Sequence, residues 1–281
     1  MDMAPFITPG TGGLGKVDLA AADGAATRIY LHGAHVTSWI PAGGEERLFL
    51  SQRAEYQAGK TIRGGIPVVF PQFSSFGPLL KHGFARAMAW QLIDVANGPQ
   101  AAARLRLVDT DETRAIWPHP FSADLTVSVG GSTLTVELAV ANTGPASFNF
   151  TAALHTYLRV DDIQTTTVQG LTGLRYLDTA ADKVQTVDSA PAVRFSGEVD
   201  RVYFDAPRQV HLVEPRRTTT IGLAGFPDAV VWNPGPVKGA ALADLEPDGY
   251  RRMVCVEAVA LGQPVLLEPG QSWSGRQTLN A

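Results

Sequence analysis

The 281-residue sequence contains almost no cysteine. Its single cysteine, Cys255, excludes a disulfide bond within one chain and is typical of a protein kept in a reducing compartment. Cys255 lies in the apolar run MVCVEAV, where we expect a buried, inert thiol rather than a nucleophile. The expected location is therefore the cytoplasm.

Long apolar runs and an excess of positive charge are also lacking, and we do not expect a secretory leader. No segment approaches the roughly 20 apolar residues of a membrane span. The start, MDMAPFITPGTGGLG, has an acidic second residue and neither the basic nor the apolar region of a secretory leader. With 23 Lys and Arg against 27 Asp and Glu, the net charge is −4, which argues against general nucleic-acid binding. We expect neither a nucleic-acid nor a membrane partner.

Helical periodicity is weak, and strand periodicity takes its place. No amphipathic pattern persists for three helical turns, and the best candidate is a short piece within GAALADLEPDG. Glycine (28) and proline (19) are spread along the chain and divide it into short segments. In SADLTVSVGGSTLTVELAV, a turn at Gly130–Gly131 precedes a strict alternation of apolar residues from Leu134 to Val140. The pattern predicts an all-β protein, a large antiparallel sandwich forming a single domain over residues 1–281.

Strand geometry sorts the side chains of FNFTAALHTYLRV onto two faces. His155 shares the polar face with Asn149, Thr151 and Tyr157, where it could contact a polar ligand. For any single histidine, an exposed or structurally hydrogen-bonded role is the simpler interpretation.

Glu257 is unusual because it stands in the middle of an apolar strand. In MVCVEAV it shares a face with Met253, Cys255 and Val259. A carboxylate is seldom found there unless it is paired or used, and desolvation would raise its pKa and make it a better base. A salt bridge to a buried arginine is the alternative of equal weight.

Positive charge is concentrated in KHGFAR. Lys81, His82 and Arg86 surround Gly83, which leaves room for a close approach to the backbone. Arginine offers a planar donor fork to an anion, and lysine a mobile point charge. A solvated basic loop is the alternative, but Arg63 in the glycine-rich segment IRGG could converge on the same anion.

Other motifs point away from cofactors and metals. His32 and His35 are three residues apart, so a strand would send them to opposite faces, and Gly33 suggests a bulge or turn; a zinc site is not expected. The glycines form neither a phosphate-binding loop nor a dinucleotide fingerprint, and there is no Gly-x-Ser-x-Gly elbow. We expect no cofactor and no metal site.

Six motifs in order resemble one known family. IRGGIPVVFPQF, KHGFARAMAW, LHTYLRV, GEVDRVYFD, VVWNPGP and MVCVEA are similar to segments of the aldose 1-epimerase-like superfamily and, more narrowly, of the hexose-6-phosphate mutarotases. The resemblance covers nearly the whole chain. It implies the galactose-mutarotase-like β-supersandwich, in agreement with the strand pattern.

The resemblance also implies roles for individual residues. His155 corresponds to the general acid and Glu257 to the general base. Arg63, His82 and Arg86 correspond to the substrate site.

The same resemblance assigns further residues around the substrate. Asp200 is expected to bind sugar hydroxyls. Lys81 stands where relatives often carry glutamine, so its role is open, although it suits an anionic ligand. Gln72 and Asn233 are expected to contact the site from a second tier.

The function implied is the cofactor-independent interconversion of the α and β anomers of hexose 6-phosphates, with a small hexose phosphate as the partner and a monomer as the expected state. Two alternatives stay open: an aldose 1-epimerase acting on unphosphorylated sugars, and a non-catalytic carbohydrate-binding domain.

Overall fold

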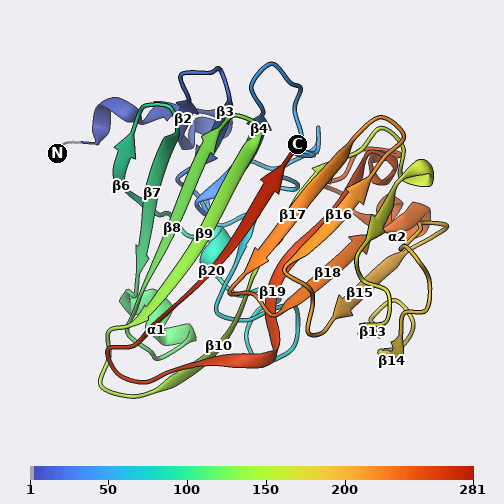
Figure 1. Cartoon of the computed structure of the whole chain (residues 1–281). Coiled ribbons are helices and arrows are strands. Elements are labelled where there is room, and N and C mark those ends of the chain that lie inside the picture. The colour runs from blue at the N-terminus through green and yellow to red at the C-terminus, as the bar shows by residue number, and fades with distance from the viewer. Residues whose placement is uncertain (1–2) are drawn as a thin grey trace.

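The computed structural model describes residues 3–281. Asp2, the acidic second residue of the sequence, lies outside the described residues. The described chain is nearly all β and forms three antiparallel sheets with few helices (Figure 1), so the predicted fold class is confirmed.

The three sheets are numbered by the position of their first strand in the chain. The first sheet has the order β1 (Thr8–Pro9), β2 (Gly15–Ala20), β3 (Ala26–Tyr30), β4 (His35–Ile40). The second sheet has the order β14 (Val184–Val187), β13 (Arg175–Asp178), β15 (Val199–Tyr203), β18 (Asp228–Asn233), β19 (Met253–Leu267), β10 (Phe148–Leu154), β5 (Val68–Val69), with β11 (Tyr157–Arg159) also paired to β19. The third sheet has the order β12 (Thr167–Gln169), β16 (Gln209–Val213), β17 (Thr218–Ala224), β20 (Ser272–Asn280), β9 (Thr133–Asn142), β8 (Phe121–Gly130), β7 (Ala101–Val108), β6 (Gln91–Ala96). The helices are α1 (Asp111–Ile116) and α2 (Gly235–Ala241), with 3₁₀ turns at Ala4–Phe6, Thr11–Gly13, Ala85–Ala87, Ile163–Thr165 and Gly249–Arg252.

The predicted hairpin is β8 and β9, with its turn one residue later than expected. Residues buried in the core alternate along both strands, as the period-two pattern predicted. Gly130 is still paired with Thr133, so the turn consists of Gly131 and Ser132. Gly131 has φ +59°, the left-handed conformation that such a turn requires at its first position.

The two helices are short, which explains why their positions were not predicted. The piece expected within residues 239–249 is instead α2, which begins at Gly235 and ends at Ala241. Helix α1 was not predicted, because its six residues are too few for an amphipathic pattern. Its start is fixed by a capping box between Thr110 and Thr113.

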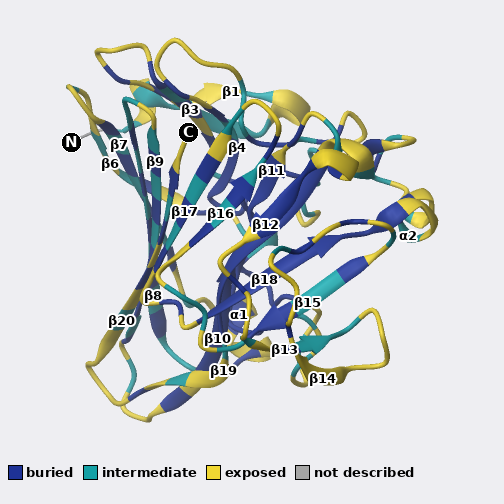
Figure 2. Ribbon diagram, turned by 45° about the vertical axis from the view of Figure 1, so that its right-hand side comes forward, coloured by how far each residue is buried: buried dark blue, intermediate teal, exposed yellow. Residues whose placement is uncertain are grey.

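The middle of the second sheet, β18 and the first half of β19, is buried on both faces, whereas β14 at its edge is exposed (Figure 2). Val254, Val256 and Ala258 of β19 join the main hydrophobic core, which takes residues from all three sheets. Met253, Cys255 and Val259 point the other way into a smaller apolar cluster, so the predicted division of faces is confirmed. The single domain over residues 1–281 stays a prediction. Burial on both faces makes a polar group in the first half of β19 expensive to ionise.

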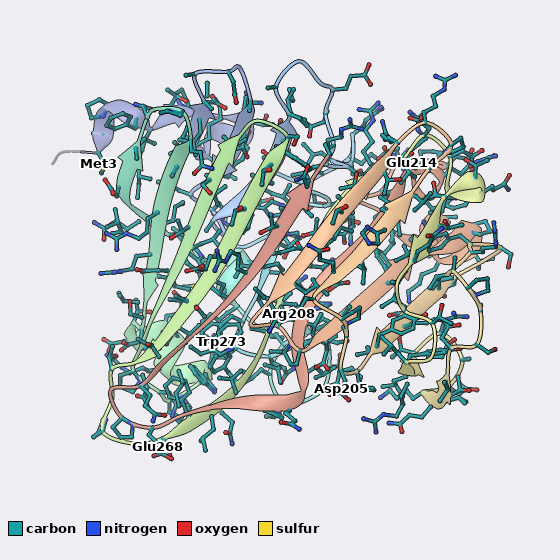
Figure 3. The ribbon with its side chains drawn as sticks, in the orientation of Figure 1. Met3, Asp205, Arg208, Glu214, Glu268 and Trp273 are labelled. Atoms are coloured by element: carbon teal, nitrogen blue, oxygen red, sulfur yellow. The ribbon has the colours of Figure 1, made fainter. Side chains whose placement is uncertain are left out.

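An aromatic group closes the core near the start of β20 (Figure 3). Trp273 packs edge-on against Phe150 of β10 and Phe226, with ring centroids 5.6 and 5.1 Å apart. Among residues 3–281, no helix is long and apolar enough to cross a membrane.

His35 connects the first sheet to the segment that carries Arg63. It is fully buried, and its Nε2 donates to the carbonyl of Gly64 over 2.7 Å. Gly64 and Gly65 have φ +107° and +62°, and a Cβ atom on either would meet backbone oxygens within 2.4 Å. Only glycine fits this crossing, and His35 keeps it in place.

The pH dependence of stability tests this role of His35. Burial lowers the pKa of His35 from 6.5 to about 4, and the Gly64 bond only partly opposes the shift. Between these values the unfolded chain binds a proton that the folded chain refuses, so stability is lost as pH falls from 6.5 toward 4. This proton uptake lowers the free energy of unfolding by about 3 kcal/mol between pH 6.5 and pH 4.

The variant His35→Gln keeps a donor but cannot titrate. Its free energy of unfolding, measured by urea denaturation, should vary less steeply between pH 7 and pH 4.5 than that of the wild type. Equal slopes would show that His35 titrates normally in the folded protein.

Candidate active site

A cavity of about 190 Å³ opens on the face of the second sheet that points away from the main core. All seven residues assigned to the site from sequence line it: Arg63, Lys81, His82, Arg86, His155, Asp200 and Glu257. The lining also includes residues that the sequence did not assign to the site: Phe73, Ser74, Phe76, Tyr157, Thr179, Val202, Val230, Trp232, Lys238 and Leu242. The cavity therefore gathers segments from residue 63 to residue 257.

His155 and Glu257 face each other at the floor of this cavity. His155 occupies the break between β10 and β11, where its backbone N–H bonds to the Pro67 carbonyl instead of to β19. Glu257 lies within β19, opposite Val230 of β18. The two side chains meet with His155 Nε2 and Glu257 Oε1 3.4 Å apart, and the residues are only 8% and 2% exposed. The predicted strand is thus interrupted, but its face assignment places His155 correctly.

Aromatic rings fix the His155 imidazole. Tyr157 stacks on it with centroids 4.9 Å apart and planes at 11°, while Trp232 and His82 contact it edge-on at 5.9 and 5.4 Å. Nδ1 of His155 and Oε2 of Glu257 are buried and have no hydrogen-bond partner among the described residues. The pair is therefore buried and oriented, and two of its polar atoms have no protein partner, which is typical of a site that binds a polar ligand.

Burial shifts the two pKa values in opposite directions. It raises the pKa of the Glu257 carboxyl well above 4.5; Asp200 adds to this shift, while Lys81 and Arg86 oppose it. It also lowers the pKa of His155 well below 6.5, helped by the charges of Arg86 and Arg63. Burial thus favours the uncharged form of both groups, a protonated Glu257 carboxyl and a neutral His155 imidazole.

His82 is a neutral donor and not one of the cations. Burial lowers its pKa, and His155 and Arg86 lower it further. Its Nδ1 accepts a hydrogen bond from the Ser74 backbone N–H over 3.3 Å, so the remaining proton is on Nε2.

Arg63 is held rigidly beside the acid–base pair. Its Nε and Nη2 both lie 3.1 Å from Oδ2 of Asp244, and its Nη1 donates to the Tyr157 hydroxyl over 2.9 Å. Burial alone would lower the pKa of Arg63, but the interactions with Tyr157 and Asp244 are stronger and raise it.

Lys81 and Arg86 have no such carboxylate partner among the described residues. Arg86 donates from Nη2 to the Lys81 carbonyl over 2.8 Å, and burial lowers its pKa. Gly83, between these two residues, does allow a close approach to its backbone, but the group that approaches is the Phe70 backbone and not a ligand. A Cβ at Gly83 would meet the Phe70 carbonyl at 2.2 Å, so this glycine shapes the loop rather than a ligand contact.

The opposite wall carries Asp200 and a cation that the sequence did not reveal. Burial raises the pKa of the Asp200 carboxyl, although Thr179 and Lys238 oppose the shift. Lys238 of α2 lies 2.5 Å from Glu198 and 4.0 Å from Asp200. No pattern in the sequence marks Lys238, because it belongs to a helix too short to be recognised.

Gln72 and Asn233 do not line the cavity and instead fix its loops. Gln72 binds the backbone of Ser74 and Leu79 with both ends of its amide. Asn233 donates to the carbonyls of Tyr250 and Met253 and accepts from Gly235 N–H. Both residues therefore contact the loops around the cavity and not the cavity itself, which is how they act from a second tier.

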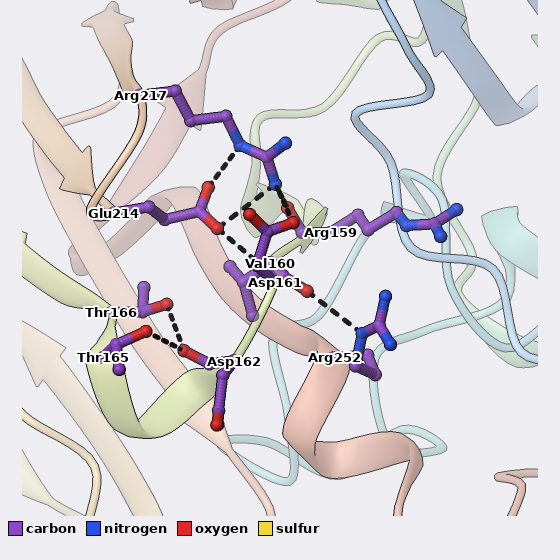
Figure 4. A network of polar contacts seen from close by, with 9 residues as sticks. All are labelled: Arg159, Val160, Asp161, Asp162, Thr165, Thr166, Glu214, Arg217 and Arg252. Carbon is purple, nitrogen blue, oxygen red and sulfur yellow. Dashed lines mark hydrogen bonds and ion pairs between the residues drawn. The ribbon is translucent and has the colours of Figure 1, made fainter.

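A polar network fixes the far end of β11 (Figure 4). Arg217 forms a two-pronged ion pair with Glu214, with distances of 2.6 and 3.1 Å. Glu214 also accepts from the Asp161 backbone N–H over 2.8 Å, and Arg252 donates to the Val160 carbonyl. These contacts restrain the segment that follows Tyr157 and so help to hold the ring stacked on His155.

Comparison with known proteins agrees with this geometry. The sequence profile of the family described as Aldose 1-epimerase matches residues 15–280. A protein of Cenchrus ciliaris named "Putative glucose-6-phosphate 1-epimerase" is 40% identical over 280 residues, which is 96% of this chain and 85% of that protein. The crystal structure of a "putative mutarotase (YeaD)" from Salmonella typhimurium has a TM-score of 0.91 at 29% identity, covering 99% of this chain and 94% of that one.

The fold is shared more widely. A galactose mutarotase-like protein from Lactobacillus casei has a TM-score of 0.75 at 15% identity, over 95% of this chain and 99% of that one. The chain belongs to the aldose 1-epimerase family. It is accordingly an isomerase, with the mutarotase chemistry of that family.

Replacing Glu257 by glutamine should stabilise the protein at neutral pH. Below pH 4.5 the carboxyl is protonated in both states, but above it the unfolded chain releases the proton and the folded chain keeps it. Stability is therefore lost as pH rises from 4.5 toward the raised folded pKa. Glutamine does not ionise, so Glu257→Gln should gain about 0.5–2 kcal/mol at pH 7.5 and little at pH 4.5.

Urea unfolding of both proteins at the two pH values measures this difference. A variant that is equally or less stable than the wild type at pH 7.5 would contradict an unfavourable buried carboxyl.

Proposed function

We propose that this enzyme interconverts the α and β anomers of hexose 6-phosphates such as glucose 6-phosphate, by acid–base ring opening and reclosure without a cofactor. One observation carries the proposal: two cations without carboxylate partners, Lys81 and Arg86, line the same cavity as the His155–Glu257 pair. The name of the Cenchrus ciliaris relative supports the same substrate class.

The reaction requires one proton to leave and another to arrive at neighbouring atoms. A base removes the proton of the anomeric hydroxyl while an acid protonates the ring oxygen; the C1–ring oxygen bond breaks and leaves an open aldehyde. Rotation about the C1–C2 bond and reclosure give the other anomer. Because both oxygens are bonded to C1, the acid and the base must be close together, as the 3.4 Å contact allows.

One proton on the pair is sufficient for this chemistry. Protonated Glu257 with neutral His155, and ionised Glu257 with protonated His155, contain the same number of protons. The working form, with Glu257 as base and His155 as acid, is reached by moving that proton within the pair rather than by exchange with solvent. A well-placed acid or base contributes roughly 10²–10⁴-fold to the rate.

The unpaired cations favour a phosphorylated sugar. A half-buried arginine without a carboxylate partner, as Arg86 is, gains much from an anionic ligand, and a phosphate offers oxygens that match its donor fork. Arg63 is already paired with Asp244 and supplies a fixed positive field. Asp200 and Lys238 on the opposite wall are placed to bind sugar hydroxyls or the phosphate.

Magnetisation-exchange NMR tests the function directly. The protein should accelerate exchange between the two anomers of glucose 6-phosphate far more than exchange between those of glucose. Equal acceleration of both sugars would favour an epimerase for unphosphorylated aldoses. Binding without faster exchange would favour a non-catalytic carbohydrate-binding protein.

The acid–base assignment predicts large losses of turnover. His155→Ala and Glu257→Gln should each lower kcat by about 10²–10⁴-fold while the protein stays folded and binds substrate. Glu257→Gln preserves the shape of the side chain and removes its ability to accept or release a proton, so it isolates basicity. Circular dichroism checks the fold, and near-wild-type kcat in either folded variant would remove that residue from the assignment.

The phosphate assignment predicts a substrate-dependent effect of Arg86→Ala. Loss of a charge-assisted hydrogen bond, worth about 1.5–3 kcal/mol, should lower kcat/KM for glucose 6-phosphate by roughly ten- to a hundredfold. Any activity on glucose should change much less. Lys81→Ala should have a smaller effect, because its exposed ammonium is better screened.

Arg106→Ala is the matched control, since Arg106 is paired with Asp124 on the third sheet and does not line the cavity. An equal fall on both sugars in Arg86→Ala would exclude a specific phosphate contact.

A further inference from the structure

Three metal-ligating side chains lie close together, two of them, His155 and Glu257, in the lining of the cavity and the third, Cys255, buried behind it. An imidazole nitrogen of His155, the sulfur of Cys255 and a carboxylate oxygen of Glu257 all lie within 4.8 Å of one another. Cys255 and Glu257 are two residues apart on one face of β19, and His155 comes from the paired segment. This arrangement brings the single cysteine of the chain beside the proposed acid–base pair.

Two atoms of this trio are buried and have no partner. They are Oε2 of Glu257 and Nδ1 of His155, in residues that are 2% and 8% exposed. Unsatisfied buried polar atoms are rare in folded proteins, so each of these two side chains keeps an atom free for a ligand beside the Nε2–Oε1 contact. Cys255 is itself fully buried.

The spacing is close to that of a tetrahedral metal site. Zinc–ligand bonds of about 2.0–2.3 Å place neighbouring ligand atoms roughly 3.3–3.8 Å apart. The His155 Nε2 to Glu257 Oε1 distance of 3.4 Å already falls in this range. The sulfur of Cys255 lies within 4.8 Å of both other ligand atoms.

We propose that His155, Cys255 and Glu257 form an inhibitory binding site for Zn²⁺. Thiolate and imidazole ligands select zinc and similar transition metals, whereas Mg²⁺ and Ca²⁺ require oxygen ligands. The thiol proton of Cys255 and the proton shared by the pair leave to solvent as the three bonds form, and a water completes the tetrahedron. The positive charges of Lys81 and Arg86 oppose the cation, so binding is reversible and weaker than at a structural zinc site.

The metal would be an inhibitor and not a cofactor. It would occupy the nitrogen and oxygen that the proposed function assigns to proton transfer, so zinc and sugar would exclude each other. The kinetic part of this inference rests on the proposed function, whereas metal binding does not.

Binding is tested first on the intact protein, with Co²⁺ as the probe. Cobalt bound by a thiolate gives a charge-transfer band in the near ultraviolet, and the wild type should show it with about one metal per chain. Cys255→Ser should lose the band and Zn²⁺ binding by equilibrium dialysis should fall at least tenfold. If the serine variant does not fold, Cys255→Ala and His155→Ala replace it in the same measurement.

The second experiment tests inhibition. The rate of each protein with zinc is compared with the rate of the same protein without metal. At free Zn²⁺ about ten times its dissociation constant, the apparent KM for glucose 6-phosphate should rise about tenfold with kcat unchanged. Cys255→Ser should change less than twofold, which also controls for zinc bound by the substrate itself. Mg²⁺ should have no such effect, and a chelator should restore the wild-type rate.

The two experiments separate the failure of this inference from the failure of the proposed function. A wild type without the cobalt band, or one inhibited by zinc to the same extent as Cys255→Ser, overturns the site. A cobalt band in a protein that does not speed anomer exchange supports the site and rejects only the proposed function.

Discussion

The burial of a carboxyl group against a histidine is the constraint on which the rest of this structure depends. Glu257 is 2% exposed and lies on a strand whose opposite face belongs to the main core. No arginine pairs with it among the described residues, so the salt bridge that offered an ordinary explanation is absent. The large hydrophobic core around Glu257 offsets the free-energy cost of burying this carboxyl, because both faces of this part of the second sheet are covered.

The loops around the pair are fixed by backbone hydrogen bonds from buried polar side chains. His35 holds the Arg63 segment, Gln72 holds the loop that leads to His82, and Asn233 holds the start of α2, which carries Lys238. Each binds carbonyl or N–H groups that would otherwise lack partners in a buried loop. Pre-organisation of the charged groups thus comes from neutral residues that do not touch the cavity.

Much of the fold could be predicted because alternation is a local signal. Burial along β8 and β9 follows the sequence pattern, and the same rule placed Glu257 with Met253 and Cys255 on one face of β19. The exact turn and the helices were missed, because a one-residue shift or a six-residue helix leaves no periodic trace.

The site was predictable in its residues but not in its electrostatics. The motifs supplied all seven assigned residues, and the fold brings them into one cavity. Charge state depends on burial by distant segments, so the neutral His82 and the ion pair between Arg63 and Asp244 could not be inferred from the motif. Lys238 was missed for the same reason, since only the folded chain brings α2 to the cavity.

The central expectation is that the proton of the buried pair lies on Glu257 and not on His155, because burial raises the pKa of the carboxyl and lowers the pKa of the imidazole. Carbon-13 NMR of labelled glutamate carboxyls, with Glu257 assigned by its absence in Glu257→Gln, measures this directly. The account predicts a protonated Glu257 carboxyl at pH 7, together with nitrogen-15 shifts of a neutral His155. A Glu257 signal that titrates near its ordinary pKa of 4.5, or a charged His155 at pH 7, would contradict it.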